Sequence, residues 1–394
     1  MTERIYYNDP YARTFEAHVV EVRSVNGRPG VTLDRSAFYP TSGGQPFDLG
    51  TLNATRVVEV IEDDDGEMVH VIEGALSAGE PVSGAIDWDR RFDHMQQHTG
   101  QHVLSAAFDR LLKVRTESFH LGAESATIDL AREVSPTEIA RAEKDANDIV
   151  WADRPVAIRY ADAAEAARLP LRKESVREGV LRLIDVEGYD ISACGGTHVS
   201  RTGAIGVIAV ASWEKFRGGS RIEFVCGGRA LAAFRSLRDA TAASVRLLSV
   251  LPSEMPGAIE RTQADAKEAK RRIKDLQAQL AAHEAEALAA SEAESRTVIR
   301  ALDGWDQNSL KSIAMAICER PGFMAVLIGS APPLPIVIAR GGGSAHDSAA
   351  LLTKLVEKFG GKGGGRPDLA QGGGLQGDPQ EIVAFAKTLI AGHS

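Results

Sequence analysis

Two short motifs contain the side chains with the most specific chemistry in this 394-residue chain. In His98-Thr-Gly-Gln-His102 the imidazoles are four residues apart, so on a helix they lie on one face. In Cys194-Gly-Gly-Thr-His198 a thiol and a third imidazole have the same spacing, and the glycines allow a tight bend. Three nitrogen donors and one sulfur donor suit zinc. We therefore predict one zinc ion per chain, held by His98, His102, Cys194 and His198.

The ligand spacing excludes one class of zinc enzyme and leaves the role of the metal open. A zinc protease of the H-E-x-x-H type has a glutamate directly after the first histidine as its general base. Thr99 stands at that position here, which excludes such a protease. Four protein ligands are typical of structural zinc, whereas catalytic zinc keeps one position for water or substrate. Ligand number alone therefore favours a structural metal.

The first motif lies in a helix predicted from His94 to Leu112. Leu104, Phe108 and Leu111 fall on one helical face, and His94, His98, His102 and Asp109 fall roughly opposite. For His94 we expect a place behind the ligands or in solvent rather than a fifth metal bond. Asp109 either orients a ligand or is an exposed helix acid, and the second interpretation is favoured.

Residues 1–90 are predicted to form a small β-barrel or meander. The β-rich runs are Val31–Leu33, Thr55–Glu62, Met68–Ile72 and Val82–Ile86. Turn signals stand at Asn26-Gly27, Ser42-Gly43-Gly44, Asp65-Gly66 and Ser83-Gly84. Their regular spacing is typical of such a small all-β unit.

Residues 91–228 are predicted to be a mixed α+β region that contains both metal motifs. Ser118–Leu121 and Ala126–Leu130 indicate a hairpin around Gly122. Ser135-Pro136-Thr137-Glu138 has the signature of a capping box and predicts a helix that runs to Trp151.

Residues 229–299 are predicted to be a long helical linker, broken at Pro252 and Pro256. A heptad seam of aliphatic residues follows: Ile259, Ala266, Ile273, Leu280 and Ala287, with Ala269 and Leu276 between them. The seam indicates packing on another helix. A hairpin within the chain is favoured over a homodimer through the linker, and both interpretations stay open. We expect the chain to be a monomer, or a homodimer through this linker or the C-terminal domain.

Residues 300–394 alternate predicted helices and strands and indicate an α/β domain. A glycine-rich segment, residues 360–374, separates the last two helices. From Arg300 onward there are nine Lys or Arg and eight Asp or Glu, whereas the residues before it carry 36 and 46. The C-terminal part is therefore the part of the chain that would repel a bound anion least.

The overall composition predicts an acidic protein of a reducing compartment. The formal net charge is −9, which argues against a protein that wraps nucleic acid by charge alone. Only Cys194, Cys226 and Cys318 are present, too few for a disulfide framework, and the last two are expected to be core residues. The first residues contain no apolar signal sequence, so we expect a cytoplasmic protein without a membrane segment.

Three motifs in this order resemble the editing half of alanyl-tRNA synthetase. They are Phe38-Tyr-Pro-Thr-Ser-Gly-Gly-Gln-Pro46, the His98–His102 motif, and the Cys194–His198 motif with Arg201-Thr-Gly203. The segment from Gly363 to Gln371 is similar to the C-terminal DHH-associated domain, which that synthetase also carries. Without an aminoacylation half, the chain resembles the long form of the free-standing alanyl-tRNA editing proteins, AlaX.

This resemblance implies hydrolysis in trans of tRNA(Ala) mischarged with serine, with glycine as a second substrate. The four zinc ligands of the family correspond to the four residues named above. Its Gly-Gly-Gln segment corresponds to Gly43, Gly44 and Gln45 near the substrate. Thr41 and Gln45 have the chemistry to recognise a serine hydroxyl, although an ordinary satisfied turn is an equal alternative.

The DHH-associated domain resembles a tRNA-binding module, so Lys362, Gly363, Gly364 and Arg366 are candidates for a tRNA-contacting loop. A flexible linker is the simpler alternative, and the segment is not a Walker A loop. Lys215, Arg217 and Arg221 are also possible tRNA contacts, although a solvated surface is favoured.

Three other functions compete with editing of alanyl-tRNA. The first is a non-enzymatic tRNA-binding protein with structural zinc. The second is a phosphoesterase, which is disfavoured because Asp93-His94 is followed by Met95 and no Asp-His-His motif results. The third is an editing enzyme for another tRNA, such as threonyl-tRNA, which the Phe38–Pro46 motif disfavours.

Overall fold

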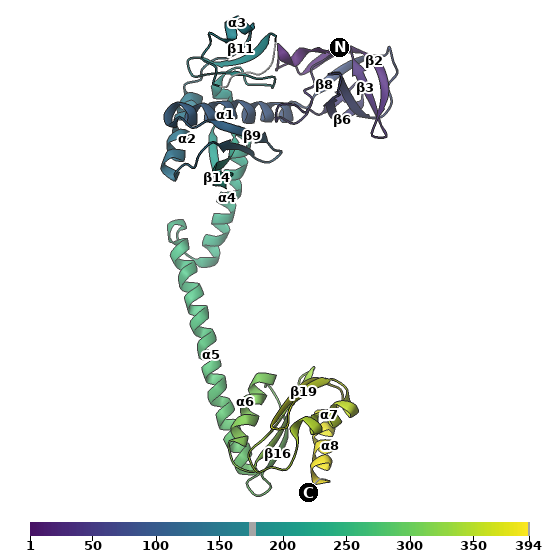
Figure 1. Cartoon of the computed structure of the whole chain (residues 1–394), viewed down its shortest axis with the longest axis vertical. Coiled ribbons are helices and arrows are strands. Elements are labelled where there is room, and N and C mark those ends of the chain that lie inside the picture. Colours follow the sequence, from purple (N-terminus) through teal and green to yellow (C-terminus); the bar gives the residue numbers. More distant parts are fainter. Residues whose placement is uncertain (173–178, 393–394) are drawn as a thin grey trace. The chain divides into compact units, whose positions relative to one another are not determined.

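The computed structural model describes residues 1–172 and 179–392 (Figure 1). The chain forms two compact units, Met1–Ala243 and Ser244–Ser394, and each is described by itself. In the described residues no helix is both long enough and apolar enough to cross a bilayer.

The first unit begins with a closed six-stranded barrel, which confirms the predicted small β-barrel. Its strand order is β2 (Thr14–Val25), β3 (Arg28–Leu33), β7 (Met68–Glu73), β6 (Thr55–Glu62), β5 (Gly50–Leu52) and β8 (Pro81–Ile86). β2 alternates between exposed and buried side chains and places Phe15, Ala17 and Val19 in the barrel core. The short strands β1 (Glu3–Arg4) and β4 (Arg35–Ser36) pair in parallel beside it.

One predicted turn in the barrel is wrong. Ser83-Gly84 lies inside β8, where residues 83 and 84 pair with residues of β2. A Cβ atom on Gly84 would lie 2.2 Å from the ring of Phe15. The glycine therefore makes room for an aromatic ring on the neighbouring strand rather than forming a turn.

A central helix, α1 (Trp88–Leu112), joins the barrel to the rest of the first unit. It begins six residues before the predicted start because Asp87 caps it and accepts from the Arg90 amide. The buried Arg91 guanidinium fixes this helix to the barrel: Nε lies 3.0 Å from Asp48 Oδ1, and Nη1 donates to the Pro10 carbonyl at 2.8 Å.

Two small sheets and two further helices surround α1. One sheet has the order β14 (Ile208–Phe216), β15 (Gly219–Cys226), β10 (Ala126–Leu130) and β9 (Thr116–Leu121). The other contains β11 (Val156–Ala161), β12 (Leu181–Val186) and β13 (Asp190–Ala193). The helices are α2 (Pro136–Trp151), with the predicted capping box at Ser135, and α3 (Ala163–Ala166). This confirms the mixed α+β character of the region.

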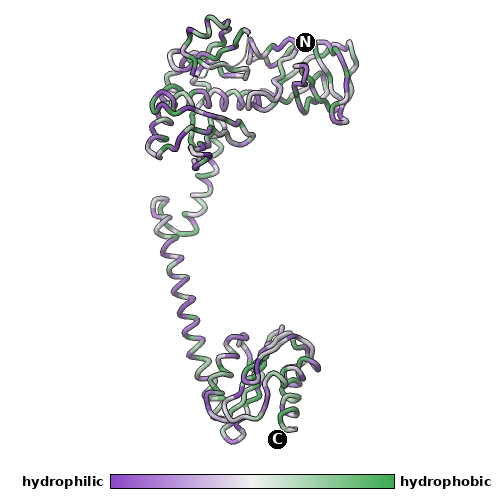
Figure 2. Tube along the Cα trace, viewed as in Figure 1, coloured by the Kyte–Doolittle hydropathy of each residue, from purple (hydrophilic) through white to green (hydrophobic). Residues whose placement is uncertain are grey.

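The predicted linker contains two helices, α4 (Gly227–Leu248) and α5 (Met255–Ser291), with a 3-10 turn at Pro252–Glu254 between them. The boundary between the two units falls within α4, so packing of the pair as a hairpin stays a prediction. α5 is largely hydrophilic along its length (Figure 2). Its heptad residues Ile273, Leu276 and Leu280 are each more than half exposed, and a homodimer through them also stays a prediction.

The second unit consists of one five-stranded sheet covered by helices on both faces. The strand order is β16 (Thr297–Leu302), β17 (Met324–Gly329), β18 (Leu334–Arg340), β20 (Leu369–Leu375) and β19 (Lys362–Arg366). One core lies between the sheet, α6 (Gln307–Cys318) and the buried alanines at the end of α5. The other core contains side chains of α7 (Ser348–Phe359) and α8 (Pro379–Ala391).

One expectation for the second unit is corrected by this sheet. In the described part of the unit, β16 and β17 pair in parallel, and the other neighbouring strands pair antiparallel. The four residues between β17 and β18 are too few for a crossover, so those strands form a hairpin. The correction concerns the glycine-rich segment, which is not a loop or linker, because most of it forms the hairpin β19–β20.

Candidate metal centre

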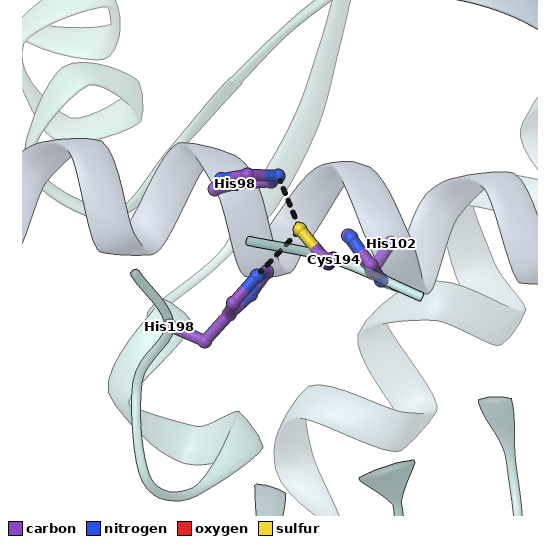
Figure 3. Close-up of side chains that lie close together, drawn as sticks. All are labelled: His98, His102, Cys194 and His198. Atoms are coloured by element: carbon purple, nitrogen blue, oxygen red, sulfur yellow. Dashed lines mark hydrogen bonds between the residues drawn. The ribbon is translucent and has the colours of Figure 1, made fainter. Parts of the chain in front are cut away.

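The structure brings the two predicted metal motifs together inside the first unit. α1 carries His98 and His102, and the segment after β13 carries Cys194 and His198 (Figure 3). Nε2 of His98 and Nε2 of His198 each lie 3.3 Å from Cys194 Sγ. One ligand atom from each of the four residues lies within 4.8 Å of the others, a separation at which all four can hold one metal ion.

The outward nitrogen of each imidazole faces an oxygen atom. Nδ1 of His98 lies 2.8 Å from Gln45 Oε1, and Nδ1 of His198 lies 3.2 Å from Thr99 Oγ1. Nδ1 of His102 lies 3.4 Å from Asp190 Oδ2. Protons on Nδ1 leave the Nε2 lone pairs for a metal, and this arrangement is usual for metal-binding histidines. The donor set and its surroundings therefore fit a metal ion.

The cysteine-containing segment packs closely against both α1 and the barrel. A Cβ atom on Gly196 would lie 2.2 Å from the His98 ring, so this position requires glycine. The Gln45 amide donates to Thr197 Oγ1 at 2.8 Å and accepts from the Thr197 backbone at 3.2 Å. Arg182 donates to the carbonyl oxygens of Cys194 and Gly196, at 2.7 and 3.0 Å.

Burial and nearby charges set the protonation of the cluster. Burial by itself raises the pKa of the Cys194 thiol, but the adjacent His98 and His198 outweigh it and hold that pKa well below its usual value. Burial, and then the charge of His98, lowers the pKa of His198 to about 3. A thiolate beside a neutral imidazole is the form in which these groups bind metal ions.

Asp190 is the charged partner behind His102. Burial by itself raises the pKa of Asp190, but the contact with His102 and the charge of Arg172 lower this pKa to about 2. Arg172 Nε donates to Asp190 Oδ1 at 2.8 Å. Burial by itself lowers the pKa of His102, while Asp190 and Cys194 raise it above the usual value overall. Asp190 thus increases the basicity of His102 as a ligand.

A cavity of about 670 Å³ opens beside the cluster. His102 and Cys194 both belong to its wall, so the cluster that could hold a metal ion borders the cavity. The N-terminal residues before the barrel, the segment between β4 and β5, α1, β9 and the sheet of β11, β12 and β13 all contribute to the lining. Its larger side chains are Arg4, Tyr6, Tyr7, Tyr39, Phe119, Tyr160, Arg172 and Arg182. Clefts of this size hold small ligands or the end of a larger one.

The four predicted catalytic and substrate-binding residues do not all lie on the cavity wall. Gly43 and Gly44 line the cavity, and a Cβ atom on Gly44 would lie 2.9 Å from the Phe119 ring. Gln45 is fully buried, and its amide contacts Thr197 and His98. Thr41 is exposed, and the lining identified for the described residues does not include it. The roles of these four residues in catalysis or binding stay predictions.

For His94 the structure excludes one of the two expected places, the solvent, and the place behind the ligands stays a prediction. His94 is 1% exposed, and neither ring nitrogen has a hydrogen-bond partner within residues 1–172 and 179–392. Burial, and then the charge of Arg90, lowers the pKa of His94 to about 4. Asp109 is half-buried near the end of α1.

The predicted tRNA contacts lie on β19 in the second unit. Lys362, Gly363, Gly364 and Arg366 are all exposed, and a Cβ atom on Gly364 would meet no atom of residues 1–172 or 179–392 within 4 Å. Arg366 Nη2 lies 3.2 Å from Asp368 Oδ2 at the turn of the hairpin. Their contact with tRNA stays a prediction. Cys226 is fully buried and Cys318 packs partly against a core, as expected.

Sequence reasoning missed several residues of the site. Asp190, Arg182 and Thr197 contact the ligands or the segment that carries them, and Gln101 lines the cavity. Gln101 and Thr197 lie inside the two metal motifs, and this position in the sequence could have indicated that they belong to the site. Asp190 and Arg182 carried no local signal.

Comparison with known proteins defines the class of this fold and site. A family model for the threonyl and alanyl tRNA synthetase second additional domain matches residues 181–223, and a DHHA1 domain model matches residues 294–392. The chain is 32% identical to the alanyl-tRNA editing protein AlaX-L of Pyrococcus horikoshii, with 100% of this chain and 99% of that protein covered. The chain therefore belongs to the AlaX-L family of alanyl-tRNA editing proteins.

The chain is also similar to part of larger synthetases. It is 33% identical to the alanine–tRNA ligase of Pyrococcus abyssi and 35% identical to that of Natronomonas pharaonis, over 94% and 95% of this chain. It spans 42% of the length of each ligase. Among solved structures, the C-Ala domain of Aquifex aeolicus alanyl-tRNA synthetase matches with 22% identity and a TM-score of 0.21, covering 23% of this chain and 85% of that one.

Proposed function

We propose that this protein hydrolyses the ester bond of mischarged tRNA(Ala) in trans, with seryl-tRNA(Ala) as the main substrate and glycyl-tRNA(Ala) as a second. One observation carries the proposal: His102 and Cys194 belong both to the metal-binding cluster and to the wall of the cavity. Membership of the AlaX-L family supports the same activity. A purely structural metal has no need to border a cavity of this size.

Zinc is the metal that we propose for the cluster, held by His98, His102, Cys194 and His198. When bound, zinc supplies a positive charge that can orient and polarise an oxygen of the substrate or of water. Gln45, Thr99 and Asp190 hold the three imidazoles in the orientation that presents Nε2. Arg182 holds the cysteine-containing segment through two carbonyl groups.

The cavity positions the ester, and positioning provides much of the rate for such a substrate. An aminoacyl ester is already activated, so a modest further lowering of the barrier is sufficient. In this proposal Gly43 and Gly44 present backbone to the substrate, because both line the cavity. Thr41 holds that turn through its backbone N–H, which donates to the Val60 carbonyl at 3.1 Å. Gln45 acts as a positioning residue through His98.

The hairpin β19–β20 is the proposed tRNA contact of the second unit. Lys362 and Arg366 supply two exposed positive charges for phosphates, and Gly363 and Gly364 leave the backbone between them uncovered. The surrounding unit lacks the acidic excess of the first one. This arrangement favours moderate, salt-sensitive binding of tRNA rather than tight wrapping.

Deacylation of tRNA(Ala) charged with serine, glycine or alanine tests the proposal, with zinc measured on the same sample. We expect about one zinc per chain, fast loss of serine and slow loss of alanine. Equal rates for serine and alanine, or no deacylation by zinc-loaded protein, would overturn it.

A second candidate is a tRNA-binding protein whose zinc is only structural. The four protein ligands favour it, because they complete a tetrahedral site without a position for water. For this candidate, zinc-loaded protein binds tRNA(Ala) but deacylates none of the three charged forms. Removal of zinc then unfolds the first unit, measured by circular dichroism, with no hydrolysis to lose.

A further inference from the structure

Gln101 combines burial, a place on the cavity wall and an unused polar atom. It lies on α1 directly before the metal ligand His102, and it is 2% exposed. It lines the same cavity as His102 and Cys194. Its side-chain oxygen, Oε1, has no hydrogen-bond partner within the described residues. A buried carbonyl oxygen without a donor is costly, so a ligand that brings a donor is favoured there.

The other half of the Gln101 amide is already bound, which determines how the side chain is oriented. Nε2 of Gln101 donates to Ser105 Oγ at 2.8 Å, and Ser105 is fully buried one turn later on α1. Thr116 Oγ1, at the start of β9, donates to the same oxygen at 2.9 Å. Because the NH2 group is held by this chain of side chains, the carbonyl oxygen is the atom left for a ligand.

The nearby polar groups are already engaged by protein partners. Oε1 of Gln45 accepts from Thr197 and faces His98, so this amide has no acceptor to spare. Ser192 on the cavity wall donates to Asp190 and accepts from Arg172. In the part of the chain described, two other buried side-chain nitrogens of cavity-lining residues make no hydrogen bond: Nη2 of Arg182, and Nδ1 of His102, which lies 3.4 Å from the Asp190 carboxylate. Both of these are nitrogen atoms, so Gln101 Oε1 is the buried acceptor of the described cavity lining that no protein donor satisfies.

We propose that Gln101 is the residue that distinguishes seryl from alanyl esters, because its Oε1 accepts a hydrogen bond from the serine hydroxyl. The inference rests on the proposed function. A seryl group provides the missing donor, whereas the methyl group of alanine leaves the oxygen unpaired and adds no compensation. A site built around a hydroxyl rejects the analogue without it far more strongly than a site that merely measures size.

A comparison of three substrates tests the hydrogen bond without any change to the protein. tRNA(Ala) charged with serine, alanine or 2-aminobutyrate is used, because 2-aminobutyrate replaces the hydroxyl by a methyl group of similar size. We expect the wild-type protein to hydrolyse the 2-aminobutyryl ester about as slowly as the alanyl ester. Equal kcat/KM for the 2-aminobutyryl and seryl esters would mean that size selects the substrate, and would overturn the proposal.

The Gln101→Met variant tests the residue itself, because methionine has a similar length and no acceptor oxygen. We expect the seryl-to-alanyl ratio of kcat/KM to fall about tenfold or more, through loss of seryl hydrolysis, with zinc content unchanged. An unchanged ratio, or an equal fall for both substrates, would overturn the assignment. An equal fall would indicate that Gln101 contacts a group common to both esters.

Gln97→Met is the matched control on the same helix. Gln97 is fully buried. Its Nε2 donates to the Cys226 carbonyl at 3.1 Å, and its Oε1 accepts from the Cys226 backbone N–H at 2.8 Å. We expect this variant to lower stability while keeping the substrate ratio. Failure of the two proposals is distinguishable: a wild-type protein that hydrolyses no seryl ester overturns both, whereas an unchanged ratio in Gln101→Met overturns only the role of Gln101.

Discussion

Oε1 of Gln45, in the segment between β4 and the barrel strand β5, lies 2.8 Å from Nδ1 of His98 on α1. The same amide binds Thr197 on the segment that carries Cys194 and His198. One side chain therefore joins the barrel, the helix and the cysteine-containing segment. This explains how a site with ligands almost 100 residues apart is held in one geometry, and it leads to the first prediction.

Replacement of Gln45 by methionine should lower zinc affinity about 10–100-fold, because the Nδ1 proton of His98 loses its acceptor. Competition with a chromogenic chelator measures the affinity. The control is Gln96→Met on the same helix, since the Gln96 amide contacts Ala204 and Gly228 and no metal ligand. An unchanged affinity in Gln45→Met would contradict the positioning role.

Replacement of Gly196 by alanine should abolish stoichiometric zinc binding. The new Cβ atom would lie 2.2 Å from Cε1 and 2.4 Å from Nδ1 of His98, so the ring or the segment must move. Gly195→Ala is the matched control for metal content, because among the described residues its Cβ would meet only the Tyr7 hydroxyl, at 3.8 Å. Zinc per chain is measured by atomic absorption. One zinc per chain in Gly196→Ala would contradict this prediction, because it would show that the segment can move away from His98 without loss of the metal.

The four clustered side chains could be predicted from the sequence because each motif is short. The four-residue interval places His98 and His102 on one face of a helix. Cys194 and His198 stand on an irregular segment, where two glycines permit the bend that brings them together. The residues that orient them could not be predicted in the same way, since Gln45 and Thr197 are 152 positions apart and meet only through the tertiary fold. Physical pattern alone did not indicate that Asp190 lies behind His102.

The strands show the same division between local and non-local causes. The barrel was predicted from short β-rich runs between regularly spaced turn signals, and its closure confirms that prediction. β19 was missed because Gly363, Gly364 and Gly365 have no side chains to indicate a strand. Ser83-Gly84 was predicted to be a turn because glycine is typical of turns. The glycine is in fact required by the ring of Phe15 on the neighbouring strand, which a sequence pattern does not show.

Acidification should destabilise the first unit through His94. The folded pKa of His94 is about 4, below the usual value of 6.5, so the fold favours the neutral ring. Its contribution to stability is therefore complete above pH 6.5 and is lost as the pH falls from 6.5 towards 4. A His94→Leu variant lacks this group, and between pH 7 and pH 5 its free energy of unfolding should gain about 2 kcal/mol relative to wild type. Urea titrations of both proteins, each loaded with zinc, measure the difference. A constant difference across that range would contradict a buried neutral His94.

The hairpin β19–β20 should contribute to tRNA binding through charge. If Lys362 and Arg366 each contact a phosphate, replacement of either by alanine should weaken binding of tRNA(Ala) and lower the salt slope by about one unit. Lys387→Ala is the control, because Lys387 is exposed on α8 in the same unit and lies outside the hairpin. Binding measured at several salt concentrations separates a lost phosphate contact from a change in fold, since misfolding removes affinity without a defined change of slope. Equal slopes for all three variants and the wild type would move the tRNA contact away from this hairpin.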